Sequence, residues 1–320
     1  MLLQDFLLRI YRPLRLRQRS GNTVRLHEST IRAYGRWLCR PPLVTDLEDD
    51  VAIASYLDAR AGRLSPWTVE RERCSLLALA RLARERGLIH VMPAVPGAPL
   101  PQRTPTAWSV DEIRRLFDAA ARDSGDIGGV PAADWWRGLL LLAWQSGERI
   151  GAILAARHDD LRPPHLTIRA EARKGRRADR VYHLSPACVA ALQAAHLPGR
   201  PELLWWPLCH TRLWGRFRPV LSRAGLSGPR VGFHQLRRTA ASHLAAAGGD
   251  APAFLGHAPG SGGRVAVAWY VDPRLRVQRP AHELLPAVTA SEATTAATTA
   301  PTAARPRQPG GGRRARTRRR

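Results

Sequence analysis

The chain has 320 residues, enough for about two domains, and its 44% of apolar residues can form ordinary cores. A net charge of +24 predicts a polyanionic partner. Nucleic acid is the commonest such partner, with an anionic membrane surface or a solvated arginine-rich surface as alternatives. A membrane-spanning protein is excluded, because the longest strongly apolar run, Leu139–Trp144, is far shorter than the ~20 residues of a span. Four widely spaced cysteines without a CxxC pair indicate neither a zinc site nor a disulfide framework. We therefore expect a cytoplasmic, nucleoid-associated protein.

The chain has a single lysine. Forty-nine of its fifty basic residues are arginine, and the remaining one is Lys174. Arginine effectively never releases its proton, whereas a lysine ammonium acts as an acid when its pKa is lowered. Lys174 is therefore a candidate for chemistry in which a proton moves, and chance survival of one lysine is the alternative.

Residues 1–92 are predicted to form an all-helical domain, with helices from Thr30 and over 49–59 and 65–86. For the last of these, Ser65-Pro66 suits the start and Gly87 suits the end. Four arginines on this helix are predicted to contact phosphates, with a solvated face as the alternative for each: Arg71, Arg73, Arg81 and Arg84.

A proline-rich, nearly uncharged stretch at 93–106 predicts an extended linker, and a second domain is expected at 107–285. Ser109 and Glu112 form a capping-box pattern ahead of its first helix. We expect helices and two β segments in the order helix 109–122, helix 133–146, strands near 166–170 and 180–184, and helices near 186–195, 211–224 and 234–247. The fold class is multidomain and mostly α with a small β-sheet. The composition of residues 286–320 predicts a disordered tail.

Three short patterns in the second domain carry candidate chemistry. Gln145-Ser-Gly-Glu-Arg149 follows an apolar helix. Apolar residues also follow Arg149, and an unpaired charge beside them would be energetically costly. His234-Gln-Leu-Arg237 places a histidine and an arginine on one helical face. Leu255-Gly-His257 is followed by Trp269-Tyr270. Taken singly, these residues have structural alternatives, namely a surface arginine, a core histidine and an aromatic core pair.

In their order along the chain, these elements resemble the tyrosine recombinase (phage integrase) family over roughly residues 25–275. The resemblance implies a helical core-binding (SAM-like) domain and a mixed α/β catalytic domain. It implies site-specific recombination of double-stranded DNA, in which strands are cut and rejoined through a 3′-phosphotyrosyl intermediate. It also implies a homotetramer on two DNA sites, with no metal, no other cofactor and no small-molecule ligand.

The resemblance implies a role for each matching position. Tyr270 would be the nucleophile, and Arg149 and Arg237 would bind the non-bridging phosphate oxygens. His234 would assist proton transfer to or from the tyrosine, and His257 would donate a hydrogen bond to the phosphate. Lys174 lies in a charged turn at 173–177, between the two predicted β segments, and would protonate the departing 5′-hydroxyl. Three arginines of this turn would contact DNA: Arg173, Arg176 and Arg177.

Two features depart from the family pattern. Most members carry an acidic residue three positions after the first arginine, where this chain has Ala152. The interval from His234 to His257 is also shorter than usual, and the interval from there to Tyr270 is longer. These departures keep open a catalytically impaired DNA-binding protein on the same scaffold. A type IB topoisomerase-like enzyme, which shares much of the active-site plan, is a further alternative that the size and the small helical N-terminal domain disfavour. A basic architectural DNA protein is another alternative. The order of five elements along the chain argues against it: an arginine, a lysine in a turn between β segments, the His-x-x-Arg pattern, Gly-His and a tyrosine.

Overall fold

The computed structural model describes residues 1–17, 21–173, 178–228, 231–256 and 270–272. They belong to two compact units, Met1–Arg103 and Thr104 onwards. The domain limits expected from the sequence, with a linker at 93–106, stay a prediction. Several predicted features lie outside the described residues, namely Lys174, Arg176, Arg177, His257 and the tail at 286–320. Among the described helices, none combines the length and the apolar character that crossing a bilayer requires.

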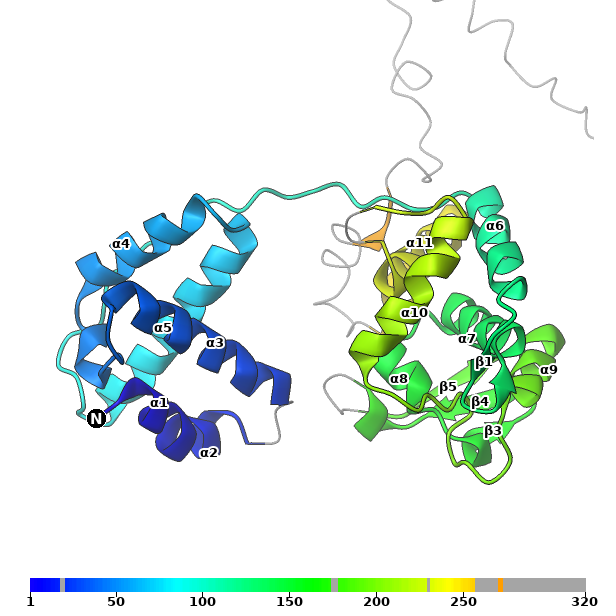
Figure 1. The fold of residues 1–320 in the computed structure, drawn as a ribbon, viewed down its shortest axis with the longest axis horizontal. Coiled ribbons are helices and arrows are strands. Elements are labelled where there is room, and N and C mark those ends of the chain that lie inside the picture. The colour runs from blue at the N-terminus through cyan, green and yellow to red at the C-terminus, as the bar shows by residue number, and fades with distance from the viewer. Residues whose placement is uncertain (18–20, 174–177, 229–230, 257–269, 273–320) are drawn as a thin grey trace, which may run out of the picture. The chain divides into compact units, whose positions relative to one another are not determined.

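The named elements of the described part of the first unit are all helical (Figure 1). Its elements are α1 Leu3–Phe6, η1 Leu7–Tyr11, α2 Arg12–Arg15, α3 Gly21–Leu38, η2 Val44–Leu47, α4 Asp50–Ala61 and α5 Pro66–Glu85. Its core includes Phe6, Leu76 and two aromatic rings, Tyr34 and Tyr56, whose centroids lie 5.2 Å apart. This arrangement confirms the expected all-helical character.

Local signals explain where the long helix α5 begins and ends. The Ser65 hydroxyl accepts a hydrogen bond from the Thr68 amide, and Pro66 occupies the first helical position. Gly87 follows the helix with φ +67°, a conformation that glycine adopts without strain. These ends agree with the sequence. Helix α3 does not, because it begins at Gly21, nine residues before the expected start at Thr30.

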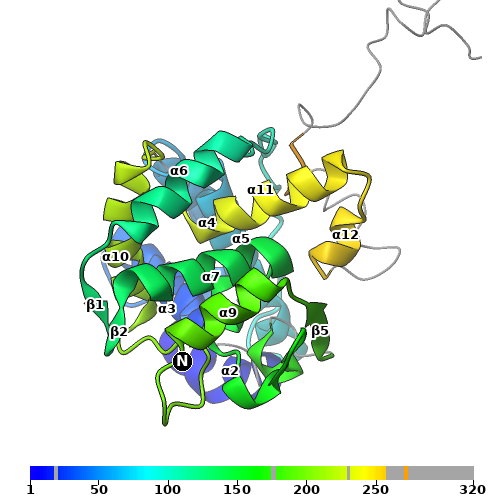
Figure 2. The same cartoon turned by 90° about the vertical axis from the view of Figure 1, so that its right-hand side faces the viewer.

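The second unit combines helices with two small sheets (Figure 2). Its helices and 3₁₀ turns are α6 Val110–Ala121, α7 Ala132–Ser146, α8 Ile150–Leu154, η3 His158–Asp160, η4 Ala170–Ala172, α9 Pro186–Ala195, α10 His210–Arg223, α11 Phe233–Ala246 and α12 Ala251–Phe254. Its strands are β1 Asp126–Ile127, β2 Val130–Pro131, β3 Leu161–Arg162, β4 His165–Ile168 and β5 Arg180–His183. The capping box of Ser109 and Glu112 forms as expected.

The two predicted β segments pair as the antiparallel strands β4 and β5, with Leu166 opposite Tyr182 and Ile168 opposite Arg180. Strand β3 adds a third strand to the outer edge of β4. Because side chains alternate across a strand, this register places Leu166, Ile168 and Tyr182 in the core. The sheet thereby fixes which side chains of β5 reach the rest of the unit.

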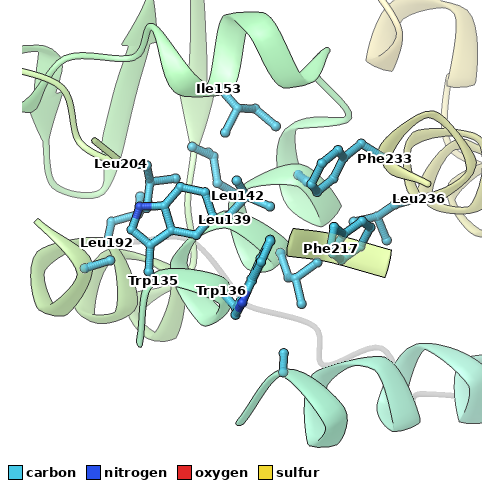
Figure 3. Packing of buried hydrophobic residues seen from close by; sticks show 14 of the residues in the cluster. Trp135, Trp136, Leu139, Leu142, Ile153, Leu192, Leu204, Phe217, Phe233 and Leu236 are labelled. Atoms are coloured by element: carbon cyan, nitrogen blue, oxygen red, sulfur yellow. The ribbon is translucent and has the colours of Figure 1, made fainter. Parts of the chain in front are cut away.

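Aromatic packing joins α7, α10 and α11 in the core of the second unit (Figure 3). The rings of Trp136 and Phe217 have centroids 5.3 Å apart, and Phe217 stacks on Phe233 at 4.2 Å with an interplanar angle of 7°. Large buried aromatic side chains contribute most to such a core. Because Phe233 is the first residue of α11, this stack fixes the helix at the turn that carries His234.

The start of the second unit is hydrogen-bonded to α11. The Trp108 amide donates to the Thr239 hydroxyl at 3.1 Å, and the Trp108 carbonyl lies 2.8 Å from Nε2 of His243. The Ala107 amide donates to the carboxylate of Asp272 at 2.8 Å. The entrance to this unit and the segment around residue 272 are therefore both attached to the same part of the fold.

Candidate active site

A tight turn after α7 positions the first candidate arginine. Helix α7 ends at Ser146, and Gly147 adopts a left-handed conformation with φ +57° and ψ +19°. A Cβ atom at Gly147 would collide with the ring of Phe254, so both the backbone conformation and the space require glycine. Arg149 then occupies the N-cap position of α8 and is half-buried.

The buried carboxylate of Glu148 lies between Gly147 and Arg149. Its Oε1 accepts hydrogen bonds from the Tyr182 hydroxyl and from Nε of Arg173, each at 2.7 Å. Burial acts to raise its pKa, but the hydrogen bonds from Tyr182 and Arg173 outweigh burial and hold the pKa below its ordinary value. The site therefore contains an ionised carboxylate that the sequence analysis missed.

Arg237 is almost fully buried, with 2% of its surface exposed. Its Nη1 donates to the carbonyl oxygen of Gly147, and its Nη2 donates to that of Leu255 at 2.7 Å. Within the described part of the chain, its Nε hydrogen has no hydrogen-bond partner. Burial, followed by the charge of Arg149, lowers the pKa of Arg237, which shows that the two guanidiniums influence each other. Two positive groups thus share one small region.

His234 lies one helical turn before Arg237. The residue as a whole is exposed, but its ring packs against Tyr270 with centroids 5.3 Å apart and an interplanar angle of 67°. Partial burial of the ring, followed by the charges of Arg238, Arg237 and Arg149, lowers the pKa of His234 to about 4. The ring is therefore neutral at pH 7 and can accept a proton.

Tyr270 is held against α11 by its backbone. Its carbonyl oxygen accepts a hydrogen bond from the Ser242 hydroxyl at 3.1 Å, and that same hydroxyl accepts one from the Asp272 amide at 2.8 Å. Val271 is buried in a small cluster with Ala241 and Leu255. The guanidinium carbon of Arg237 lies 5.8 Å from the centroid of the Tyr270 ring. The tyrosine, the histidine and one arginine are thus neighbours.

The strand pair contributes two further arginines. Arg173 binds Glu148, as described above, and also donates to the carbonyl oxygen of Ala178 at 3.0 Å. Arg180 donates to the carbonyl oxygens of Phe254 at 2.9 Å and Ala253 at 2.6 Å, at the C-terminal end of α12. The ends on either side of residues 174–177 are therefore attached to the site. Arg173 was predicted to contact DNA, but its guanidinium binds within the protein.

The four arginines of α5 that were predicted to contact phosphates differ in their exposure and in their contacts within the protein. Arg71, Arg81 and Arg84 are exposed and able to meet a phosphate backbone. Arg73 is only partly exposed, and its guanidinium binds the Glu70 carboxylate at 2.7 Å and donates to the Val95 carbonyl at 2.8 Å. These bonds give Arg73 a structural role, and its contact with DNA stays a prediction.

Residues 108–262 match the model of the phage integrase family. The chain carries a phage integrase family domain. The match includes Arg149, His234 and Arg237, and it ends before Tyr270. The integrase domain follows a helical N-terminal region, the arrangement that the structural comparison with lambda integrase also supports.

Several solved structures share the fold at low sequence identity. A lambda integrase(75–356) dimer bound to a COC′ core site gives a TM-score of 0.67 at 20% identity, covering 88% of this chain and 99% of the other. The Tn1549 transposon integrase, in complex with circular intermediate DNA, gives 0.62 at 13% identity, covering 92% and 98%. XerH site-specific recombinase, in a post-cleavage complex with a palindromic difH substrate, gives 0.62 at 17% identity, covering 81% and 79%. No curated protein matches this sequence. At these identities the comparisons show the fold alone.

Proposed function

We propose that this protein carries out site-specific DNA recombination, with Tyr270 as the nucleophile that forms a 3′-phosphotyrosyl link. The observation that carries the proposal is that the Tyr270 ring packs against His234 and lies close to Arg237, both of which belong to α11. A phenol, a neutral imidazole and a buried guanidinium are the groups that a metal-independent transesterification uses. The integrase domain and its fold support the same function.

In the proposed reaction, the Tyr270 oxygen forms a bond to the scissile phosphorus while the bond to the 5′-oxygen breaks. The tyrosine proton passes to His234, whose neutral ring at pH 7 can accept it. Arg149 and Arg237 would balance the charge that spreads over the non-bridging oxygens. Lys174 would supply the proton for the departing 5′-hydroxyl, and His257 would donate to the phosphate. Rejoining reverses each bond change with a new 5′-hydroxyl.

DNA binding would use the positive charge of both units. The exposed arginines of α5 can meet phosphates without reading sequence, so they would contribute affinity that falls with salt. Lambda integrase forms a tetramer on a Holliday junction, and we propose a homotetramer joining two duplexes for this chain too.

A covalent adduct tests the function directly. The full-length protein is incubated with nicked duplexes taken from the DNA that flanks its own coding sequence, and a denaturing gel separates protein attached to DNA. We expect an adduct that Tyr270→Phe abolishes, while DNA binding stays unchanged. Binding without an adduct on every flanking sequence would instead indicate a catalytically impaired DNA-binding protein.

A second assay separates recombination from relaxation. Two labelled duplexes bearing the mapped cleavage position are mixed with the protein, in parallel with a supercoiled plasmid. A recombinase exchanges strands between the two duplexes. A topoisomerase-like enzyme relaxes the plasmid and yields no exchanged product.

A further inference from the structure

Glu148 has an unusual position for an acidic residue in so basic a protein. It directly precedes Arg149, its side chain is 2% exposed, and its carboxylate faces arginines from two other parts of the domain. Burying an ionised carboxylate is costly unless hydrogen bonds and opposite charges compensate. Its partners therefore determine whether it only stabilises the fold or also serves the reaction.

The two carboxylate oxygens of Glu148 contact different parts of the domain. Oε1 accepts from the Tyr182 hydroxyl on β5 and from Nε of Arg173, which follows the 3₁₀ turn η4. Oε2 accepts from the Arg149 backbone amide at 3.1 Å and lies 3.9 Å from Nη1 of Arg237. One carboxylate thus connects the strand pair to the two arginines that would bind the phosphate.

The negative charge of Glu148 also reduces the repulsion between the two arginines. Arg149 and Arg237 repel each other, and the carboxylate of Glu148 is the anionic group that offsets this repulsion at Arg237. A buried guanidinium between backbone carbonyls can shift by an ångström when its counter-ion is removed, and such displacements are costly in catalysis. With the anion present, the Arg237 guanidinium has a counter-ion and the Arg149 backbone is fixed before DNA arrives.

We propose that Glu148 is a positioning residue, which orients the Arg237 guanidinium for the scissile phosphate, holds the backbone at Arg149 and connects both to the β4–β5 strand pair. The proposal rests on the proposed function. Glu148 does not itself touch the substrate in this role. Its buried carboxylate would repel phosphate, and its oxygens already accept hydrogen bonds from three protein groups.

The test compares two substrates for the same variant. Glu148→Gln keeps the side-chain volume and removes the charge. One duplex carries the natural phosphate at the cleavage position that the wild-type adduct identifies. The other carries a methylphosphonate there, in which a methyl group replaces one charged non-bridging oxygen. The neutral group needs less help from the arginines, so a defect that acts through them shrinks on it.

We expect Glu148→Gln to slow adduct formation about 10-fold on the natural phosphate at saturating DNA, with the dissociation constant for DNA unchanged. The ratio of wild-type to variant rates should fall below about 3 on the methylphosphonate. Asp160→Asn is the matched control, because the Asp160 carboxylate also binds an arginine, Arg169, outside the site. This control should match wild type on both substrates.

Two results would overturn the proposal. One is wild-type cleavage by Glu148→Gln, and the other is an equal defect on both substrates. If Glu148→Gln melts below the assay temperature, Tyr182→Phe replaces it, since that change removes one hydrogen bond to Oε1 and no charge. Failure of the proposed function is distinguishable, because the wild type would then form no adduct with either substrate.

Discussion

The Ser242 hydroxyl donates a hydrogen bond to the carbonyl oxygen of Tyr270, and this bond attaches the segment of the proposed nucleophile to the helix that carries His234 and Arg237. The same hydroxyl accepts from the Asp272 amide, so one small side chain holds both ends of a three-residue segment. The attachment is made through the backbone of Tyr270. The position of Tyr270 therefore depends on a residue that has no chemical role of its own.

Removing this attachment should slow the reaction. We expect Ser242→Ala to lower the rate of adduct formation about 10-fold at saturating DNA, because two hydrogen bonds that orient Tyr270 are lost. Thr239→Val is the control, since it removes a buried hydroxyl of the same helix that bonds to Trp108. A Ser242→Ala rate equal to that of the Thr239→Val protein would contradict this prediction.

The titration of His234 can be measured in the protein without DNA. Its lowered pKa predicts that the neutral form persists well below pH 6.5, with a midpoint near 4. NMR spectra of histidine-labelled protein at a series of pH values report this midpoint, and the signal missing from His234→Gln assigns it. Arg238→Gln should raise the midpoint, because Arg238 is the strongest of the charges that lower it. A midpoint at or above 6.5 would show that the arginines do not surround the ring as described.

The glycine before the catalytic turn should resist substitution. Gly147→Ala places a Cβ atom in a left-handed backbone conformation and against the Phe254 ring. We expect a loss of about 2 kcal/mol in unfolding free energy by calorimetry, together with slower adduct formation. Gly215→Ala is the matched control, because a Cβ atom there meets open space within α10. The control should be neutral or stabilising by about 0.5 kcal/mol. Equal effects of the two changes would contradict the prediction.

The proposed role of Lys174 can be tested by changing the leaving group of the DNA substrate. We expect Lys174→Arg to keep DNA binding and lose about 100-fold in cleavage rate, since arginine does not give up its proton. A substrate with a sulfur in place of the 5′-bridging oxygen needs no proton on departure, so it should restore cleavage. Normal cleavage of the natural substrate by Lys174→Arg would place the general acid elsewhere.

A buried carboxylate in the first unit should govern its stability. Glu72 accepts a hydrogen bond from the Tyr56 hydroxyl at 2.8 Å and two from Arg60 at 3.1 and 3.0 Å. Burial acts to raise its pKa, but these bonds outweigh burial and lower it. Its contribution is therefore present above the ordinary carboxyl pKa and lost as the pH falls through the lowered value.

At pH 7 we expect Glu72→Gln to cost about 2 kcal/mol, seen as about 30-fold faster hydrogen exchange of α4 and α5 amides. Glu85→Gln breaks the exposed pair with Arg15 and should change exchange by less than about threefold. Comparable acceleration in both variants would show that burial does not distinguish the two carboxylates.

Local signals made much of the fold predictable. Caps such as Ser65 and the Ser109–Glu112 pair act within four residues, so the starts of α5 and α6 could be inferred from the sequence. The start of α3 could not, because Gly21 and the polar residues after it give no strong cap or apolar period. The integrase family could be inferred because its motifs keep their order along the chain.

The site was less predictable where long-range contacts decide the outcome. Glu148 could be taken for a surface acid until the sheet brought Tyr182 against it from 34 residues away. The ion pair between Arg73 and Glu70 was not predicted, although their spacing of three residues along the helix is a local signal for it. Ser242 gave no signal, because its partners Tyr270 and Asp272 come from a separate segment.

The bond between Ala107 and Asp272 has a consequence for the order of folding. It joins groups 165 residues apart in the sequence, and closing so long a loop is entropically costly until the intervening helices have packed. The segment with Tyr270 should therefore dock late, after α7, α10 and α11 have assembled. In a chain that is still being synthesised, Tyr270 would not yet be positioned. The proposed nucleophile could therefore not attack DNA before the domain is complete.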